Sequence, residues 1–170
     1  MPRFHVREMC DQDLEYVLEW RNHPDIRRFM YSQQEIGKEE HYTWFSKASI
    51  DPTKKLLIFE VDKEPVGFVN FSSIRTGNIA DWGFYLAPYA AKGTGAALGK
   101  TALDYAFNDL GLHKVCGEAL SYNQKSIRFH QKMGFEMEGV LRDQFFDGQD
   151  YHSIHCFGLL HSEWPNLQVD

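Results

Sequence analysis

Residues 90–107, AAKGTGAALGKTALDYAF, combine glycines, a lysine and a threonine in an order that could bind a phosphate group. A Walker loop needs a glycine, four residues and then Gly-Lys-Ser/Thr, but Thr94 occupies the position of that first glycine. A dinucleotide fingerprint needs G-x-G-x-x-G, and its third glycine falls on Leu98. What remains is a Gly-Thr-Gly turn that opens an amphipathic helix, whose free N-terminal amides attract anions. The alternative is a plain helix with a glycine-rich entry.

The composition restricts the function classes. The 170 residues are 43% apolar and 25% charged, which suits one globular domain spanning residues 1–170. A net charge of -6 argues against a nucleic-acid binder, which would carry a basic face. The histidines and cysteines show no H-x-x-x-H or Cys-x-x-Cys spacing, so we expect no metal site. Three cysteines, expected as buried free thiols, and the lack of a long apolar segment favour a cytoplasmic protein without a membrane span.

Hydrophobic periodicity predicts an α+β fold with a mainly antiparallel sheet. Alternating segments and turn signals predict strands over residues 3–9, 54–61, 66–74, 79–88, 113–120, 135–146 and 151–160. Helical spacing and end signals predict helices over residues 11–21, 24–32, 38–48, 96–110 and 123–133. Asp11 is the expected N-cap of the first helix.

This order of elements resembles the GCN5-related N-acetyltransferase (GNAT) superfamily. The family's coenzyme loop, Gln/Arg-x-x-Gly-x-Gly/Ala, falls on residues 90–95, although Ala90 stands in place of Gln or Arg. The segment SYNQKSIRFHQKMGFEMEGVLRD at 121–143 is a stronger match. The resemblance covers nearly the whole chain. It implies a mixed, mainly antiparallel seven-stranded sheet flanked by helices, with acetyl-CoA as co-substrate.

Two further segments narrow the resemblance. YVLEWRNHPDIRRFMYS at 16–32 and HYTWF at 41–45 resemble enzymes that acetylate the 4-amino group of UDP-4-amino-4,6-dideoxy-N-acetyl-β-L-altrosamine, in pseudaminic acid biosynthesis for flagellin glycosylation. This implies a UDP-linked amino sugar as the small-molecule partner. One alternative is a ribosomal-protein-type N-acetyltransferase of N-terminal amines, which would need an open acidic groove to bind its acceptor. Another is a non-catalytic coenzyme A-binding sensor domain. A homodimer is left open.

The resemblance also implies where coenzyme A binds. The backbone of Leu86 and Ala87 would pair with the pantetheine arm. Asn123 and Ser126 would contact the same arm, and Asn123 can also act as a simple helix N-cap. The pyrophosphate would lie on the amides of the turn, formed by Lys92, Gly93, Thr94, Gly95, Ala96 and Ala97.

Amide formation from a thioester needs a neutral amine, a proton acceptor and a donor for the leaving thiolate. Glu118 is the candidate base, because it lies on a strand after the coenzyme helix with small neighbours, and the resemblance places a glutamate in the active site here. His130 occupies the position where the family usually has a tyrosine acid. An imidazolium could donate the proton there. The alternative is that His130 only packs and coenzyme A leaves as the thiolate.

An acceptor pocket follows from aromatic, methionine and arginine side chains, which can stack a uracil ring and bind a diphosphate. The expected members are Arg21, His23, Met30, Tyr31, Trp44 and Trp82. Each could instead pack in the core, Trp44 and Met30 above all. The adjacent pair Arg27 and Arg28 could contact the UDP phosphates or form a solvated helix face.

Overall fold

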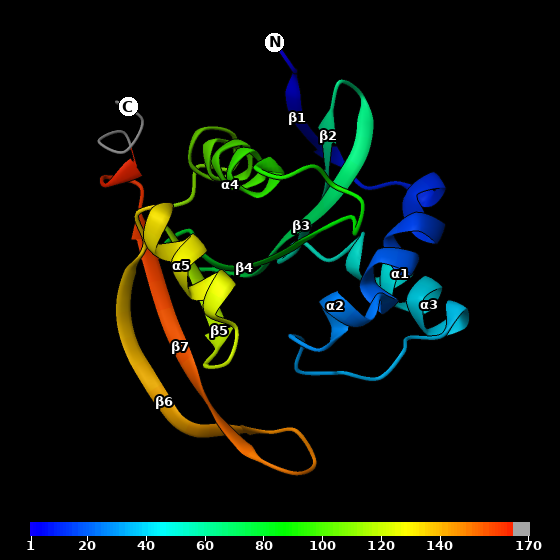
Figure 1. Cartoon of the computed structure of the whole chain (residues 1–170). Helices are drawn as coiled ribbons and strands as arrows, with labels where there is room; N and C mark the ends of the chain where they lie inside the picture. The colour runs from blue at the N-terminus through cyan, green and yellow to red at the C-terminus, as the bar shows by residue number, and fades with distance from the viewer. Residues whose placement is uncertain (165–170) are drawn as a thin grey trace.

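The computed structural model describes residues 1–164, which form a seven-stranded sheet in the order β1-β2-β3-β4-β5-β7-β6 (Figure 1). Its strands are β1 (Phe4–Glu8), β2 (Lys55–Val61), β3 (Glu64–Arg75), β4 (Ile79–Leu86), β5 (Lys114–Leu120), β6 (Glu136–Phe146) and β7 (Tyr151–Leu160). Neighbouring strands are antiparallel, except for β4 and β5, which run parallel. The predicted mixed, mainly antiparallel sheet is therefore confirmed.

Helices cover both faces of this sheet. They are α1 (Leu14–Asn22), α2 (Pro24–Arg27), α3 (Lys38–Ala48), α4 (Thr94–Asp104) and α5 (Gln124–Lys132). In Figure 1, α4 and α5 lie over one face, and α1, α2 and α3 gather on the other side of the molecule. None of the helices within residues 1–164 is long and apolar enough to cross a membrane.

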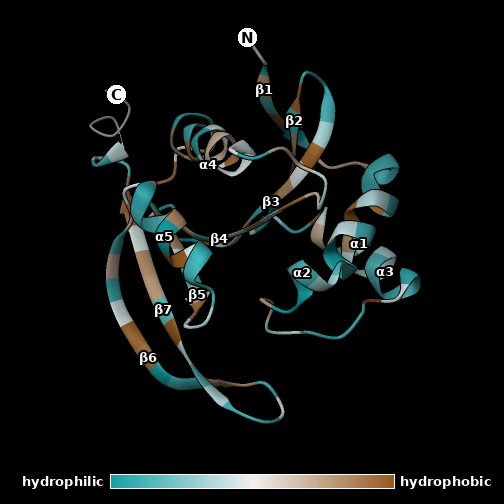
Figure 2. Ribbon diagram, viewed as in Figure 1, coloured by the Kyte–Doolittle hydropathy of each residue, from teal (hydrophilic) through white to brown (hydrophobic). Residues whose placement is uncertain are grey.

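Two hydrophobic clusters fix these layers, because successive side chains of a strand point to opposite faces. Leu57 and Phe59 of β2 pack into the cluster that includes α4 and α5. Leu56 and Ile58, their neighbours on the same strand, pack into the cluster that includes α1 and α3. The outer strand β6 is mostly exposed, and its ribbon alternates between hydrophobic and hydrophilic residues (Figure 2).

The parallel pair β4 and β5 separates soon after it forms. Only three residue pairs join the two strands, namely Ile79 with Lys114, Ala80 with Val115 and Asp81 with Cys116. Beyond them β4 continues to pair with β3 as far as Leu86, and β5 continues to pair with β7 as far as Leu120. The remaining halves of β4 and β5 therefore diverge and leave backbone groups at a split in the middle of the sheet.

Three local expectations need correction. The backbone N–H of Cys10 donates to the buried Asp13 carboxylate at 2.8 Å, so Asp13, not Asp11, satisfies the start of the first helical segment. The helix predicted over 24–32 ends at Arg27. The Arg28 carbonyl accepts from side chains, Tyr122 at 2.8 Å among them, and the chain turns away there. The thiols are not all buried, because Cys10 is exposed.

Candidate active site

Glu118 lies on β5 two residues beyond Cys116, the last residue of that strand to pair with β4. Its neighbour Ala119 is buried on the α4 and α5 face, so the exposed Glu118 side chain points to the opposite face. The Tyr31 hydroxyl donates a hydrogen bond to Glu118 Oε2. The predicted base and one predicted acceptor-pocket residue therefore meet directly beside the split.

The segment after α2 is held in place by residues far along the chain. The Tyr122 hydroxyl donates to the Arg28 carbonyl, and the Gln33 side-chain amide donates to the Tyr122 hydroxyl, both at 2.8 Å. The Tyr31 ring lies 5.6 Å from the Phe145 ring of β6. Residues 28–33 thus form a fixed wall next to Glu118. The anchors Gln33, Tyr122 and Phe145 carry no sequence signal for this role, since they lie far from their partners in the chain.

Tyr31 is a proton donor throughout the neutral range. Partial burial, together with its hydrogen bond to Glu118, raises the pKa of Tyr31 well above its ordinary value. The side chain still has 52% of its surface exposed, so a ligand can reach it.

His130 is buried, with 2% of its surface exposed, and both of its ring nitrogens have partners. The Trp82 indole N–H donates to His130 Nε2 at 3.1 Å, and His130 Nδ1 lies 2.8 Å from the Ser126 carbonyl oxygen. An indole can only donate and a carbonyl can only accept, so the ring is neutral and carries its proton on Nδ1. Burial lowers the pKa of His130, although the Ser126 bond acts in the opposite direction. This arrangement favours the packing alternative over a proton donor.

Trp82 does not belong to the acceptor pocket, and that expectation is corrected. Its side chain is 7% exposed and lies in the cluster under α4 and α5, on the face opposite Glu118. Its ring stacks against Phe135 at 5.3 Å and Phe129 at 6.2 Å. A Cβ on Gly117 would lie only 2.8 Å from Trp82 Nε1, so glycine is needed beneath these rings.

Arg21 has unmet hydrogen-bonding capacity on the acceptor side of the sheet. Its Nη2 donates to the Ser32 carbonyl at 2.8 Å, whereas Nη1 is buried and has no partner among residues 1–164. Burial lowers the pKa of Arg21, and the nearby Tyr85 and Glu40 oppose this effect. The Nε atom of Arg27 is likewise buried without a partner in the described part of the chain.

The other expected pocket residues have structural contacts of their own. His23 caps α2, since its Nδ1 accepts from the Asp25 amide at 3.2 Å. Trp44 stacks against His41 at 5.3 Å and meets the Phe68 ring edge-on at 6.1 Å. Met30 is half-buried in the segment after α2. Of the expected pocket, Tyr31 and Arg21 retain polar atoms that a ligand could engage.

The glycine-rich turn has the geometry of an anion site. Gly93 occupies the N-cap of α4 with a φ of 90°, which favours glycine, and no side chain caps the helix. The Thr94 amide donates to the Ala91 carbonyl at 3.1 Å, whereas the amides that follow it in the first turn have no partner in their own helix. A Cβ on Gly95 would make an ordinary 3.6 Å contact with Leu86, so this turn lies against the end of β4. Thr94 is tied to the turn by its hydroxyl, which donates to the Ala91 carbonyl at 2.6 Å.

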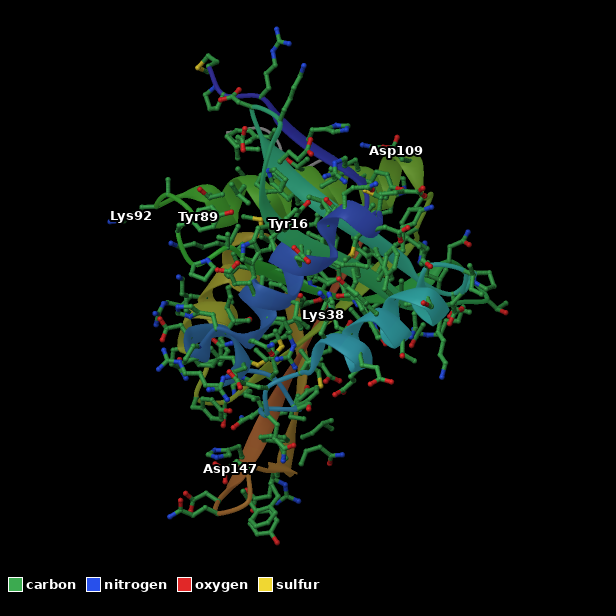
Figure 3. The ribbon with its side chains drawn as sticks, turned by 90° about the vertical axis from the view of Figure 1, so that its right-hand side faces the viewer. Tyr16, Lys38, Tyr89, Lys92, Asp109 and Asp147 are labelled. Carbon is green, nitrogen blue, oxygen red and sulfur yellow. The ribbon has the colours of Figure 1, made fainter. Side chains whose placement is uncertain are left out.

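The remaining turn residues are accessible. Lys92 and Ala96 are exposed, and Ala97 packs partly against the core. In Figure 3 the Lys92 side chain extends outward at the same edge of the molecule as Tyr89. Among residues 1–164, no hydrogen bond or ion pair holds the Lys92 ammonium, so it can reach a phosphate.

The backbone groups of Leu86 and Ala87, both predicted to pair with the pantetheine arm, point in different directions at the end of β4. The Ala87 amide donates to the Val66 carbonyl at 2.8 Å, and its carbonyl accepts from Ala90 at 3.0 Å. Ala87 therefore cannot donate to a pantetheine arm, which corrects that expectation. Because backbone groups alternate in direction along a strand, those of Leu86 point toward the split.

Asn123 is the N-cap of α5, since its Oδ1 accepts from the Ser126 amide at 3.2 Å. The side-chain nitrogen of Asn123 is not used in this cap and can still donate to a ligand. The Ser126 hydroxyl lies 3.4 Å from His130 Nδ1, where it supports the histidine ring.

The Gly-Lys-Thr sequence at 99–101 has a packing role. A Cβ on Gly99 would lie 2.6 Å from the Phe129 ring and 2.9 Å from the Met133 sulfur, so its absence lets α4 approach α5. Lys100 is exposed on the far side. Only the N-terminus of this helix therefore fits the predicted anion site. Within residues 1–164, no three His, Cys, Asp or Glu side chains are grouped so that they could hold a metal ion.

Comparisons with known proteins agree with this geometry. The family model described as acetyltransferase (GNAT) domain matches residues 3–136. Acetyltransferase PseH of Campylobacter jejuni is 31% identical over 75% of this chain and 80% of its own length. Spermidine N(1)-acetyltransferase of Escherichia coli is 28% identical over 90% of this chain and 85% of its own length. The structure of spermidine N-acetyltransferase from Vibrio cholerae with CoA and spermine matches with a TM-score of 0.89 and 25% identity, over 96% of this chain and 98% of that one.

Proposed function

The chain belongs to the GNAT acetyltransferase family, and we propose that its acceptor is the 4-amino group of a UDP-linked 4-amino-4,6-dideoxy sugar. As a family member it is an acetyl-CoA-dependent N-acetyltransferase with a small-molecule substrate. The likeness to acetyltransferase PseH, over most of both chains, supports a sugar of the pseudaminic acid pathway, UDP-4-amino-4,6-dideoxy-N-acetyl-β-L-altrosamine.

The buried, unpaired Nη1 atom of Arg21 is the main observation that supports the proposal. A buried guanidinium N–H without a partner costs free energy unless a ligand satisfies it. The charge of Arg21 interacts with Tyr85 of β4, which packs on the α1 and α3 face, the face to which Glu118 points. A diphosphate oxygen is a natural partner for such a nitrogen, because arginine binds phosphate in a fixed geometry.

The charge of residues 21–33, the segment that includes α2 and the wall, also favours an anionic acceptor. Residues 21–33 contain three arginines, Arg21, Arg27 and Arg28, against one acidic residue, Asp25. A nucleotide diphosphate would be attracted to this segment, and a polycation would be repelled.

In the proposed reaction, the neutral acceptor amine attacks the thioester carbonyl that acetyl-CoA supplies, and Glu118 takes the proton that the nitrogen loses. The Leu86 backbone and the first-turn amides of α4 hold the coenzyme, and Arg21 holds the acceptor. These groups are fixed before the substrates arrive, so they contribute mainly by positioning.

A second candidate is a polyamine acceptor, because the spermidine acetyltransferases match nearly the whole chain in sequence and in structure. A thiol-release assay with acetyl-CoA distinguishes the candidates when UDP-4-amino-4,6-dideoxy sugars, spermidine and N-terminal peptides are offered separately. We expect release with the UDP sugar.

The same assay tests the role of Arg21. Arg21→Gln should raise the KM for the sugar by roughly ten- to a hundredfold, as expected for a lost charge-assisted hydrogen bond. Arg21→Lys should recover part of this loss, because the positive charge is kept. Release with spermidine alone, unaffected by Arg21→Gln, would contradict the proposal.

A further inference from the structure

We propose that Tyr31 protonates the departing coenzyme A thiolate and recovers its proton from Glu118. Acetyl transfer needs a donor at the leaving sulfur, unless the thiolate leaves unprotonated. The structure leaves the histidine at the family's usual acid position without a proton to give. The hydrogen bond between Tyr31 and Glu118 provides another route.

His130 cannot serve as this donor in the observed arrangement. Its Nε2 accepts from Trp82, and its single proton on Nδ1 is donated to the Ser126 carbonyl within α5. Protonation of Nε2 would break the Trp82 bond and place a charge among buried aromatic rings, including Phe157 stacked at 4.9 Å.

Tyr31 is in direct contact with the predicted base. Its hydroxyl contacts Glu118 Oε2, while no hydrogen bond to Oε1 is found within residues 1–164. One carboxylate oxygen can therefore face the amine while the other remains joined to the phenol. The wall that carries Tyr31 is fixed through Tyr122 to the turn after β5, so the phenol is held beside this strand.

Glu118 and Tyr31 together carry the proton from the amine nitrogen to the sulfur. The attacking amine forms a bond from nitrogen to the carbonyl carbon, and Glu118 takes a proton from that nitrogen. As the bond from carbon to sulfur breaks, Tyr31 gives its phenol proton to the sulfur and takes the proton held by Glu118. The products are the amide and coenzyme A thiol, and both side chains return to their starting states without an external acid.

Two other phenols lie near the site and fit the role less well. The Tyr122 hydroxyl donates to the Arg28 carbonyl and accepts from Gln33. Tyr85 packs against Phe68 with ring centroids 5.1 Å apart, and no hydrogen bond joins it to Glu118 among the described residues. Tyr85 provides the matched comparison, because it can be replaced by phenylalanine in the same way as Tyr31 and its hydroxyl does not anchor residues 28–33.

The test compares two acyl donors, acetyl-CoA and acetyl-seleno-CoA, in the parent and in Tyr31→Phe and Tyr85→Phe. The acceptor is whichever of the UDP-linked 4-amino sugar and spermidine supports turnover, so the test does not depend on the acceptor proposed above. A selenol is more acidic than a thiol, so a selenolate leaves with less need for a proton. Tyr31→Phe should lower kcat with acetyl-CoA by roughly 10²–10⁴-fold, the usual range for acid–base catalysis, and by less than about tenfold with the selenoester.

Tyr85→Phe should affect the two donors equally. Equal losses with both donors in Tyr31→Phe, or a loss confined to the KM for the acceptor, would make Tyr31 a binding residue only. A selective loss in Tyr85→Phe instead of Tyr31→Phe would also overturn the proposal.

A second measurement needs no acceptor. Ultraviolet absorbance of the thiolate reports the ionisation of coenzyme A bound to the protein, and a phenol within hydrogen-bonding reach stabilises that thiolate. Bound coenzyme A should therefore ionise at a lower pH in the parent than in Tyr31→Phe, with Tyr85→Phe matching the parent. Identical titrations in the parent and Tyr31→Phe would place Tyr31 out of reach of the sulfur and overturn the proposal.

Discussion

Trp82 and His130 share a buried hydrogen bond of 3.1 Å in which the indole donates and the imidazole accepts. His130 is thereby held neutral beneath the sheet at the position where the family resemblance predicts an acid. The bond ties the interior of α5 to β4 at the level of the split. It makes His130 a structural residue whose ring supports the neighbourhood of Glu118.

The first prediction follows from this bond. His130→Phe and His130→Tyr should turn over at equal rates, since neither variant changes the proton donor. His130→Phe should also lower the free energy of unfolding by about 1–3 kcal/mol, because the Trp82 N–H loses its acceptor in a buried site. Steady-state kinetics and chemical denaturation check the two statements separately. A much higher kcat in His130→Tyr than in His130→Phe would instead show that a proton donor is needed at position 130.

The second prediction concerns acid stability. Burial lowers the pKa of His130 in the folded state, so the unfolded chain binds the proton more readily. Stability is therefore complete above the unfolded pKa and falls as the pH drops from about 7 towards about 5. His41 is buried with its pKa lowered in the same way and should contribute to the same decline. Denaturation of His130→Phe across this range should show a shallower slope than the parent, whereas an unchanged slope would contradict the assignment.

The third prediction concerns the N-terminus of α4. Gly95→Glu places a negative side chain where the pyrophosphate is expected, so acetyl-CoA affinity should fall by roughly a hundredfold or more through like-charge repulsion. The fold should survive, because an acidic residue in the first turn of a helix is stabilising. Gly95→Gln is the matched control of similar size, and it should lose less affinity. The measurement is calorimetric titration with acetyl-CoA. Equal affinities for the two variants would contradict charge repulsion as the cause of the loss.

The fourth prediction concerns Glu118. Glu118→Gln keeps an oxygen that can accept from Tyr31 but removes the basic group, so turnover should fall by roughly 10²–10⁴-fold. Acetyl-CoA affinity should not change. The loss should shrink at high pH, where more of the acceptor amine is already neutral. A loss below about tenfold that does not vary with pH would show that Glu118 lines the site without acting as the base.

Local patterns predicted the elements well, because helix and strand periodicity depend on neighbouring residues. The helix expected over 38–48 has those bounds in the structure, and Glu118 lies on the expected strand. The family resemblance, carried by residues 121–143 above all, gave the fold.

Contacts between residues that lie far apart in the chain could not be predicted from local sequence patterns. The partner of Glu118 is Tyr31, 87 positions away, and nothing in either segment indicates the other. The face on which Trp82 packs depends on the strand's place in the sheet, and the engaged backbone of Ala87 depends on its pairing with β3. The sequence therefore named most of the candidate site residues, whereas the roles of His130, Trp82 and Tyr31 required the three-dimensional arrangement.

The acceptor itself is tested most directly by competition. Equal concentrations of UDP-4-amino-4,6-dideoxy-N-acetyl-β-L-altrosamine and spermidine would be incubated with the protein and limiting acetyl-CoA, and mass spectrometry would identify the acetylated product. The unpaired Arg21 nitrogen and the three arginines of residues 21–33 predict that the acetyl group is recovered on the sugar's 4-amino nitrogen, and that Arg21→Gln reduces this preference. Recovery of the acetyl group mainly on spermidine, in both the parent and Arg21→Gln, would contradict a nucleotide-sugar acceptor.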